Sequence, residues 1–134
     1  MFHPGGQLGA KLLHVRDLMH SGDSLPLVES GTRMMQAILQ ISQKGFGCVG
    51  VGREQALIGI ITDGDLRRSL STSLLDEKVD DVMTANPQTI SGDLLAAEAL
   101  EMLNKRKITA LMVTEAEKPV GILHLHDLLR VGAA

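Results

Sequence analysis

The stretch GIITDGDL at residues 59–66 returns in altered form as GILHLHDL at residues 121–128. A second pair of stretches, VRDLM at residues 15–19 and VDDVM at residues 79–83, precedes them at nearly the same spacing. The chain is therefore an internal repeat, with copies over residues 15–70 and 79–134 and a linker at 71–78. One unit of this size seldom buries enough surface to fold alone. We expect the copies to pack around a shared cleft with pseudo-twofold symmetry.

The two copies predict the same order of elements: a short strand, a helix with apolar residues at helical spacing, two buried strands and a closing helix. The expected ranges are 26–28, 32–44, 46–51, 56–61 and 65–70 in the first copy, and 89–90, 94–105, 108–113, 119–123 and 127–131 in the second. We therefore predict an α+β fold, a tandem repeat of two β-α-β-β-α units in which helices cover one face of each sheet.

Composition narrows the class of function. The 134 residues carry a formal net charge of −3 and two Phe with no Tyr or Trp, which disfavours phosphate-backbone binding and base stacking. The single cysteine, Cys48, indicates a reducing compartment. No apolar run reaches the length of a membrane span, and no secretory signal is visible. We expect a cytoplasmic protein with neither a nucleic-acid nor a membrane partner.

The order of elements, with its Gly-apolar-apolar-Thr-x-x-Asp ending, resembles a tandem CBS-domain pair (a Bateman module). The segments at residues 2–13, 62–68 and 123–130 are also similar to arabinose-5-phosphate isomerases. Proteins of that family join an N-terminal sugar-isomerase domain to a C-terminal CBS pair. They interconvert D-ribulose 5-phosphate and D-arabinose 5-phosphate on the route to Kdo, an acid sugar of lipopolysaccharide or capsule. The resemblance implies that residues 1–14 are the tail of a preceding isomerase domain.

The resemblance also implies where a ligand binds. In CBS pairs that bind nucleotides, the residue matching Thr62 contacts phosphate and the residue matching Asp65 holds ribose hydroxyls. The second copy has His124 and Asp127 at these positions, and the histidine can donate a hydrogen bond to a phosphate or an acidic sugar. This difference leaves open whether both sites take the same ligand.

Three more residues complete the predicted ligand-binding set. Lys44 and Arg106 precede matching strands, where some CBS pairs carry a basic residue that reaches phosphate. His126 stands two residues after His124. The chain offers too few partners for a zinc site, so we expect a surface or cleft histidine here and include it among the candidate ligand-binding residues. We predict no metal and no cofactor.

A purely structural explanation competes at several of these positions. Thr-x-x-Asp ahead of a helix is also the sequence of a capping box, which stabilises a helix by roughly 0.5–2 kcal/mol without any ligand. Cations near a helix C-terminus, such as Lys44 and Arg106, are favourable for their own reasons. Histidine is a weaker N-cap than threonine, so capping explains His124 less well than Thr62.

No catalytic constellation is visible in the chain, neither a nucleophile beside a base nor a Gly-x-x-x-x-Gly-Lys loop. Only His3 is carried over from the isomerase active site, and it would act there only with the preceding domain. The leading hypothesis is a non-catalytic regulatory module that binds a nucleotide or nucleotide sugar, such as CMP-Kdo or AMP. We expect it to form a homodimer within a tetrameric parent enzyme. The alternatives are a dimerisation scaffold without ligand and a stand-alone adenine-nucleotide sensor.

Overall fold

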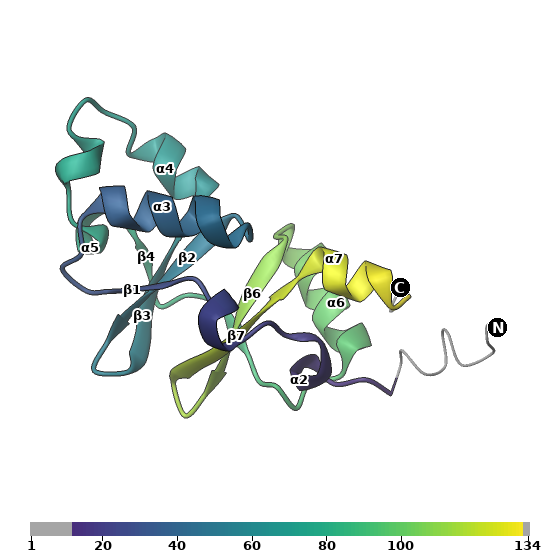
Figure 1. The fold of residues 1–134 in the computed structure, drawn as a ribbon. Helices are drawn as coiled ribbons and strands as arrows, with labels where there is room; N and C mark the ends of the chain where they lie inside the picture. The colour runs from purple at the N-terminus through teal and green to yellow at the C-terminus, as the bar shows by residue number, and fades with distance from the viewer. Residues whose placement is uncertain (1–11, 133–134) are drawn as a thin grey trace.

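The computed structural model describes residues 12–132, which form two similar units side by side (Figure 1). The first sheet has the order β1 (Leu27–Glu29), β2 (Cys48–Arg53), β3 (Ala56–Thr62) and β4 (Thr84–Ala85). The second has the order β5 (Thr89–Ile90), β6 (Ala110–Glu115) and β7 (Lys118–His124). In both, the short first strand is parallel to the second, and the second and third form an antiparallel hairpin. The predicted α+β repeat is confirmed.

Six helices accompany the sheets in the described residues, together with two short 3₁₀ turns at Gly22–Ser24 and Leu74–Asp76. They are α2 (Val15–Leu18), α3 (Met34–Lys44), α4 (Asp63–Arg68), α5 (Val79–Val82), α6 (Ala96–Arg106) and α7 (Leu125–Arg130). The closing helices α4 and α7 begin two residues earlier than predicted, because Thr62 and His124 act as their N-caps. Asp65 and Asp127, which we expect at the first position of each helix, occupy the third helical position instead.

The opening helix of each repeat packs on the other repeat. Val15 of α2 is fully buried in the core of the second unit, and its N–H donates to the Leu94 carbonyl at 2.8 Å. Just beyond α2, His20 pairs with Ile122 of β7 as an antiparallel bridge. The segment from α2 to His20 therefore completes the second unit, although it belongs to the first repeat.

The opening helix of the second repeat, α5, packs in the same way on the first unit. Val79 of α5 is fully buried in the core of the first unit, and its N–H donates to the Thr32 carbonyl at 2.8 Å. Thr84 of β4 then pairs with Ile60 of β3. Neither unit is complete without residues from the other copy, so the two repeats form one cooperative fold.

A glycine in each closing strand makes room for this exchange. A Cβ added to Gly121 would lie 2.5 Å from Sδ of Met19, and one added to Gly59 would collide with Met83. The two methionines end the opening motifs, so the glycines at the start of the closing motifs are explained by close packing rather than by backbone conformation.

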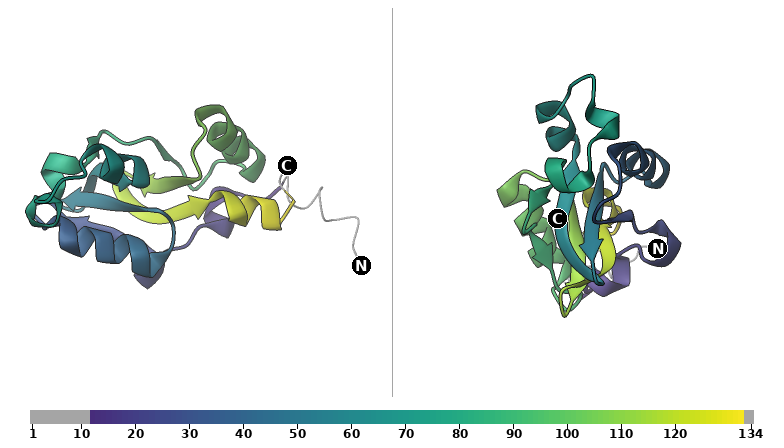
Figure 2. Two further views of the ribbon diagram at one scale, coloured as in Figure 1. Left: turned by 90° about the horizontal axis from the view of Figure 1, so that it is seen from above. Right: turned by 90° about the vertical axis from the view of Figure 1, so that its left-hand side faces the viewer.

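A third group of side chains joins the two units. Cys48, Met112 and Ile122 are buried together between the sheets, with apolar neighbours from both repeats. The strands of both units run through the middle of the molecule, and α3 and α6 lie on opposite sides of it (Figure 2). Thr62 ends β3 and His124 ends β7, and each of these strand ends lies beside residues of the other unit.

Candidate functional site

A cavity of about 410 Å³ opens between the two units. The first unit contributes the end of β3 and the start of α4, with Thr62, Asp63, Gly64 and Arg67. The second contributes the chain from Lys107 to Leu111, which leads from α6 into β6. The volume lies in the range that small-molecule sites occupy. We call this space the first cavity.

The first cavity has an apolar wall and a charged rim. Phe46, Ile60 and Ile108 supply apolar surface. Arg67 and Lys107 are both exposed cations at its edge. This arrangement can hold a flat apolar group on one side and an anion on the other.

Neither of the two predicted basic residues, Lys44 and Arg106, lines the first cavity. The Lys44 ammonium donates to the backbone carbonyl of Asp23, and Arg106 is exposed at the end of α6. Lys107 lies at the cavity instead, because it takes the left-handed conformation that ends α6, with φ 57°. Sequence reasoning selected the neighbouring residue because it aligned Arg106 with Lys44 and ignored the cap; the equivalent cap of α3 is Gly45.

Asp65 is buried and its carboxylate is fully engaged, with 3% of the residue exposed. Oδ2 accepts from the Thr62 N–H at 2.9 Å and from its hydroxyl at 3.2 Å. Oδ1 accepts from the Thr84 hydroxyl at 2.8 Å and from the Arg68 guanidinium. Burial alone would raise the pKa of Asp65, but the hydrogen bonds from Thr62, Thr84 and Arg68 outweigh it and hold the pKa below 3.8.

Asp65 is therefore an ionised anchor rather than a wall of the first cavity. It closes the capping box on α4, in which Thr62 Oγ1 accepts from the Asp65 N–H at 3.4 Å, and it ties the exchanged strand β4 to the first unit. The capping explanation is confirmed for this pair. The acidic residue that lines the first cavity is Asp63.

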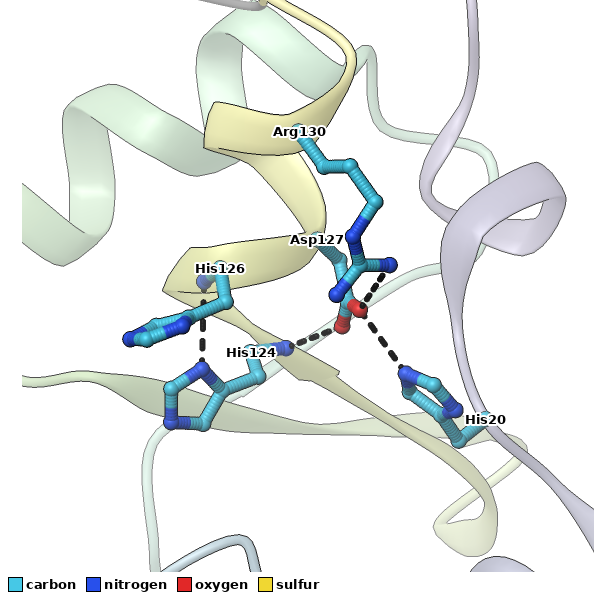
Figure 3. Close-up of polar contacts among 5 residues, drawn as sticks. All are labelled: His20, His124, His126, Asp127 and Arg130. Atoms are coloured by element: carbon cyan, nitrogen blue, oxygen red, sulfur yellow. Dashed lines mark hydrogen bonds and ion pairs between the residues drawn. The ribbon is translucent and has the colours of Figure 1, made fainter.

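The second cavity, of about 420 Å³, surrounds the equivalent residues of the second repeat. Its lining includes His20, Phe46, His124, His126, Asp127 and Arg130. Figure 3 shows the His20 ring, the Arg130 guanidinium and the backbone N–H of His124 meeting at the Asp127 carboxylate, while the His124 ring points toward His126.

Asp127 is the counterpart of Asp65 and is 4% exposed. Its Oδ1 lies 2.8 Å from Nε2 of His20 and 3.5 Å from Nη1 of Arg130. Its Oδ2 accepts from the His124 N–H at 2.9 Å. Thus His20 in this unit does what Thr84 does in the first: it binds the buried aspartate from the exchanged segment.

His124 caps α7, although the sequence made capping a weaker explanation here than at Thr62. Its Nδ1 accepts a hydrogen bond from the His126 N–H at 3.1 Å (Figure 3). Burial lowers the pKa of His124, the nearby His126 and His20 lower it further, and Asp127 opposes them. A neutral ring with an unprotonated Nδ1 is the form that this cap requires.

Sequence reasoning missed His20, Phe46, Arg67 and Lys107 at the cavities. Phe46 lines both cavities, and its ring centroid lies 5.0 Å from that of His20 and 6.3 Å from that of His124. The sequence places His20 directly after VRDLM, as it places Thr84 directly after VDDVM, so the two residues are equivalent in the repeat. That each binds the aspartate of a closing motif becomes clear only when the opening segments are seen to pack on the other repeat, and the repeat pattern does not show this.

Two findings bear on other expected features. Within residues 12–132, no group of three or more His, Cys, Asp or Glu side chains could hold a metal ion. No helix in that same range is long and apolar enough to cross a membrane. The predicted tail at residues 1–14, including His3, lies outside the described residues except for its last three positions.

Among proteins of known sequence, arabinose 5-phosphate isomerase KdsD of Pseudomonas aeruginosa is 47% identical over 135 residues, which cover 97% of this chain and 41% of that protein. The uncharacterized protein RP505 of Rickettsia prowazekii is 40% identical over 135 residues, covering 100% of this chain and 42% of that protein. The chain thus spans about two fifths of the length of the curated relatives it matches.

Solved structures share the fold at lower identity. A crystal structure of CBSX2 in complex with AMP superimposes with a TM-score of 0.75 at 24% identity, covering 88% of this chain and 94% of that one. The CBS domain pair of MJ0100, in complex with 5'-methylthioadenosine and S-adenosyl-L-methionine, gives 0.76 at 22% identity, covering 88% and 94%. The family model of the CBS domain matches the chain twice, at residues 15–72 and 79–134. The chain belongs to the CBS-domain family, as a tandem pair.

Proposed function

We propose that this chain is the non-catalytic regulatory module of a D-arabinose-5-phosphate isomerase and binds a nucleotide or nucleotide sugar, such as CMP-Kdo or AMP. The observation that carries the proposal is the first cavity, which combines an apolar wall with two cations at the junction of the repeats. Similarity to KdsD supports the parent enzyme, and the fold shared with a chain crystallised with AMP supports the ligand class.

In the proposed complex the base lies on the apolar wall of Phe46 and Ile108, and the phosphate meets Arg67 and Lys107. A guanidinium offers two parallel donors to phosphate, and an ammonium adds a mobile point charge. Thr62 contributes its hydroxyl at the start of α4. Asp65 acts through Thr62, by holding the capped turn in place.

His124, His126 and Asp127 belong to the same proposal through the second cavity. There the donors of His126 and Arg130 serve a further anionic group, while Asp127 holds His124 and His20 in position. Control of the parent enzyme would then require that the ligand bind one arrangement of the module more tightly than another.

Calorimetric titration with CMP, CMP-Kdo, AMP and ATP tests the proposal. Arg67→Ala and Lys107→Ala should each weaken binding about tenfold or more, because a hydrogen bond to a charged group contributes about 1.5–3 kcal/mol. Arg106→Ala is the matched control, since it removes the same charge one residue from Lys107 but outside the cavity. Absence of heat with all four ligands into the millimolar range would refute the ligand claim.

A second function, assembly of the parent enzyme, is favoured by one observation. Met35 and Leu39 lie one turn apart on α3, and each is 50% exposed. We propose that α3 forms a homodimer contact within a tetrameric parent, in the cytoplasm, where the free, buried Cys48 stays reduced. Light scattering should give a dimer for the wild type and a monomer for Leu39→Glu; a dimer in both would exclude α3 as the contact.

A further inference from the structure

The opening motifs of the two repeats present the same apolar side chains to the units that accept them. α2 lies with the second unit and α5 with the first (Figure 1). Val15 and Val79 are each fully buried in the accepting unit. Met19 and Met83 each lie against the glycine that begins the closing motif of that unit. Because these contacts are equivalent, they do not determine which unit an opening segment joins.

The opening motifs differ in charge at one position, where the second repeat has Asp80 and the first has Arg16. Asp80 is held by the loop between β1 and α3 of the first unit. Its Oδ2 accepts from the Ser30 hydroxyl at 2.5 Å, and its Oδ1 accepts from the Gly31 N–H at 2.6 Å. The Arg53 guanidinium, at the end of β2, lies 3.4 Å from Oδ2. The hydrogen bonds from Ser30 and Gly31 hold the pKa of Asp80 below 3.8, so the first unit receives a charged carboxylate.

The second unit presents acidic side chains at the equivalent place. The Arg16 guanidinium forms an ion pair with Asp93, which is the counterpart of Gly31. Glu115 ends β6 where Arg53 ends β2, and it lines the same surface cavity as Arg16. The accepting surfaces of the two units therefore carry opposite charges, and each complements the segment that it receives.

We infer that this inversion of charge selects, during folding, which unit each opening segment joins. In the opposite arrangement, with each segment packed on its own repeat, Arg16 would lie beside Arg53. Asp80 would lie beside Asp93 and Glu115. Contacts between like charges are unfavourable, and the donors that hold Asp80 would lose their carboxylate. Wrong pairing of similar units is a characteristic failure of repeat proteins, and the charges disfavour it here.

A competition between two disulfides in the full 134-residue chain reports the arrangement. His14 faces Leu95 and Lys78 faces Arg33 as antiparallel bridges, and the hydrogen bonds lie on the flanking residues. Such pairs bring the Cα atoms close enough for a disulfide. A Cys48→Ala chain with His14→Cys, Arg33→Cys and Leu95→Cys is folded in a glutathione buffer. Position 14 then pairs with position 95 in the exchanged arrangement and with position 33 in the opposite one, and peptide mass spectrometry gives the ratio.

With the natural charges, the disulfide between positions 14 and 95 should predominate. Arg16→Asp combined with Asp80→Arg should lower the ratio about tenfold or more, which is the effect of one lost hydrogen bond to a charged group. Adding Arg53→Glu, Asp93→Asn and Glu115→Arg reverses the accepting surfaces and should restore the ratio. This rescue keeps the test decisive if the doubly changed chain folds poorly, because the chain with reversed surfaces should fold again.

Asp81→Arg is the matched control for Asp80→Arg. It makes the same change of charge one residue further along α5, at an exposed side chain that is not among the contacts described above. Asp80→Arg alone should lower the ratio, and Asp81→Arg should leave it unchanged. An equal response to these two changes, or no response to Arg16→Asp with Asp80→Arg, would overturn the inference. Failure of the reversed surfaces to restore the ratio would overturn it as well.

Discussion

Replacement of Asp65 by alanine should destabilise the fold by about 3 kcal/mol. Loss of the capping contact to the Thr62 N–H, at 2.9 Å, costs about 1 kcal/mol. Loss of the 2.8 Å bond from Thr84 to a buried charge costs about 1.5–3 kcal/mol. We assign nothing to Arg68, whose side chain is 69% exposed. For a chain of this size the sum lowers Tm by about 10 °C.

Asp65→Ala should also change how the free energy of unfolding depends on pH in acid solution. Because hydrogen bonds hold the pKa of Asp65 below 3.8 in the folded state, its contribution is fully present above that pH. The contribution is lost as the pH falls through the lower folded pKa. The stability curves of wild type and Asp65→Ala should therefore run parallel above pH 3.8 and converge below it.

Urea unfolding followed by circular dichroism, repeated over acid to neutral pH, measures both effects. Asp63→Ala is the control, because Asp63 is an exposed carboxylate in the first turn of the same helix, and its loss should cost at most about 1 kcal/mol. A loss for Asp65→Ala no larger than for Asp63→Ala, or curves that stay parallel into acid, would refute the anchoring role of Asp65.

Three other properties can be measured on the same protein. Gly121→Ala should cost about 1–3 kcal/mol by overpacking Met19, and less in a Met19→Ala background; strictly additive losses in urea unfolding would exclude the contact. Burial raises the pKa of Cys48 to about 12, so a thiol reagent should label it only as fast as the protein opens, and rapid labelling of the native chain would contradict this. Burial and the neighbouring His126 lower the pKa of His124 from 6.5, so stability that depends on its neutral form is present above 6.5 and lost as the pH falls through the lower folded value. A ring-proton NMR titration should show a neutral His124 at pH 7, and a charged ring there would rule out the cap.

Local patterns in the chain were sufficient to predict much of the fold. The paired motifs predicted two α+β units. A glycine, a run of apolar strand residues and a capping sequence each indicate a local structure, and each can be recognised within a short stretch of the chain. The capping pair Thr62 and Asp65 was predictable for the same reason. The structure differs from the expectation at two positions where a pattern had two explanations. Lys107 rather than Arg106 lines the first cavity, and the ring nitrogen of His124 accepts a capping bond although histidine is expected to cap less well than threonine.

The sequence by itself determined that this protein is a repeat, what each unit is made of and that Thr62 and Asp65 form a capping pair. Only the tertiary structure decided which copy completes which unit, that His20 meets Asp127 and Thr84 meets Asp65, and which cations reach a cavity. The physical reason is distance along the chain: these contacts join residues 107 and 19 positions apart, through segments exchanged between the repeats. Periodicity and capping sequences are local features, so they do not show on which of the two similar units a segment will pack.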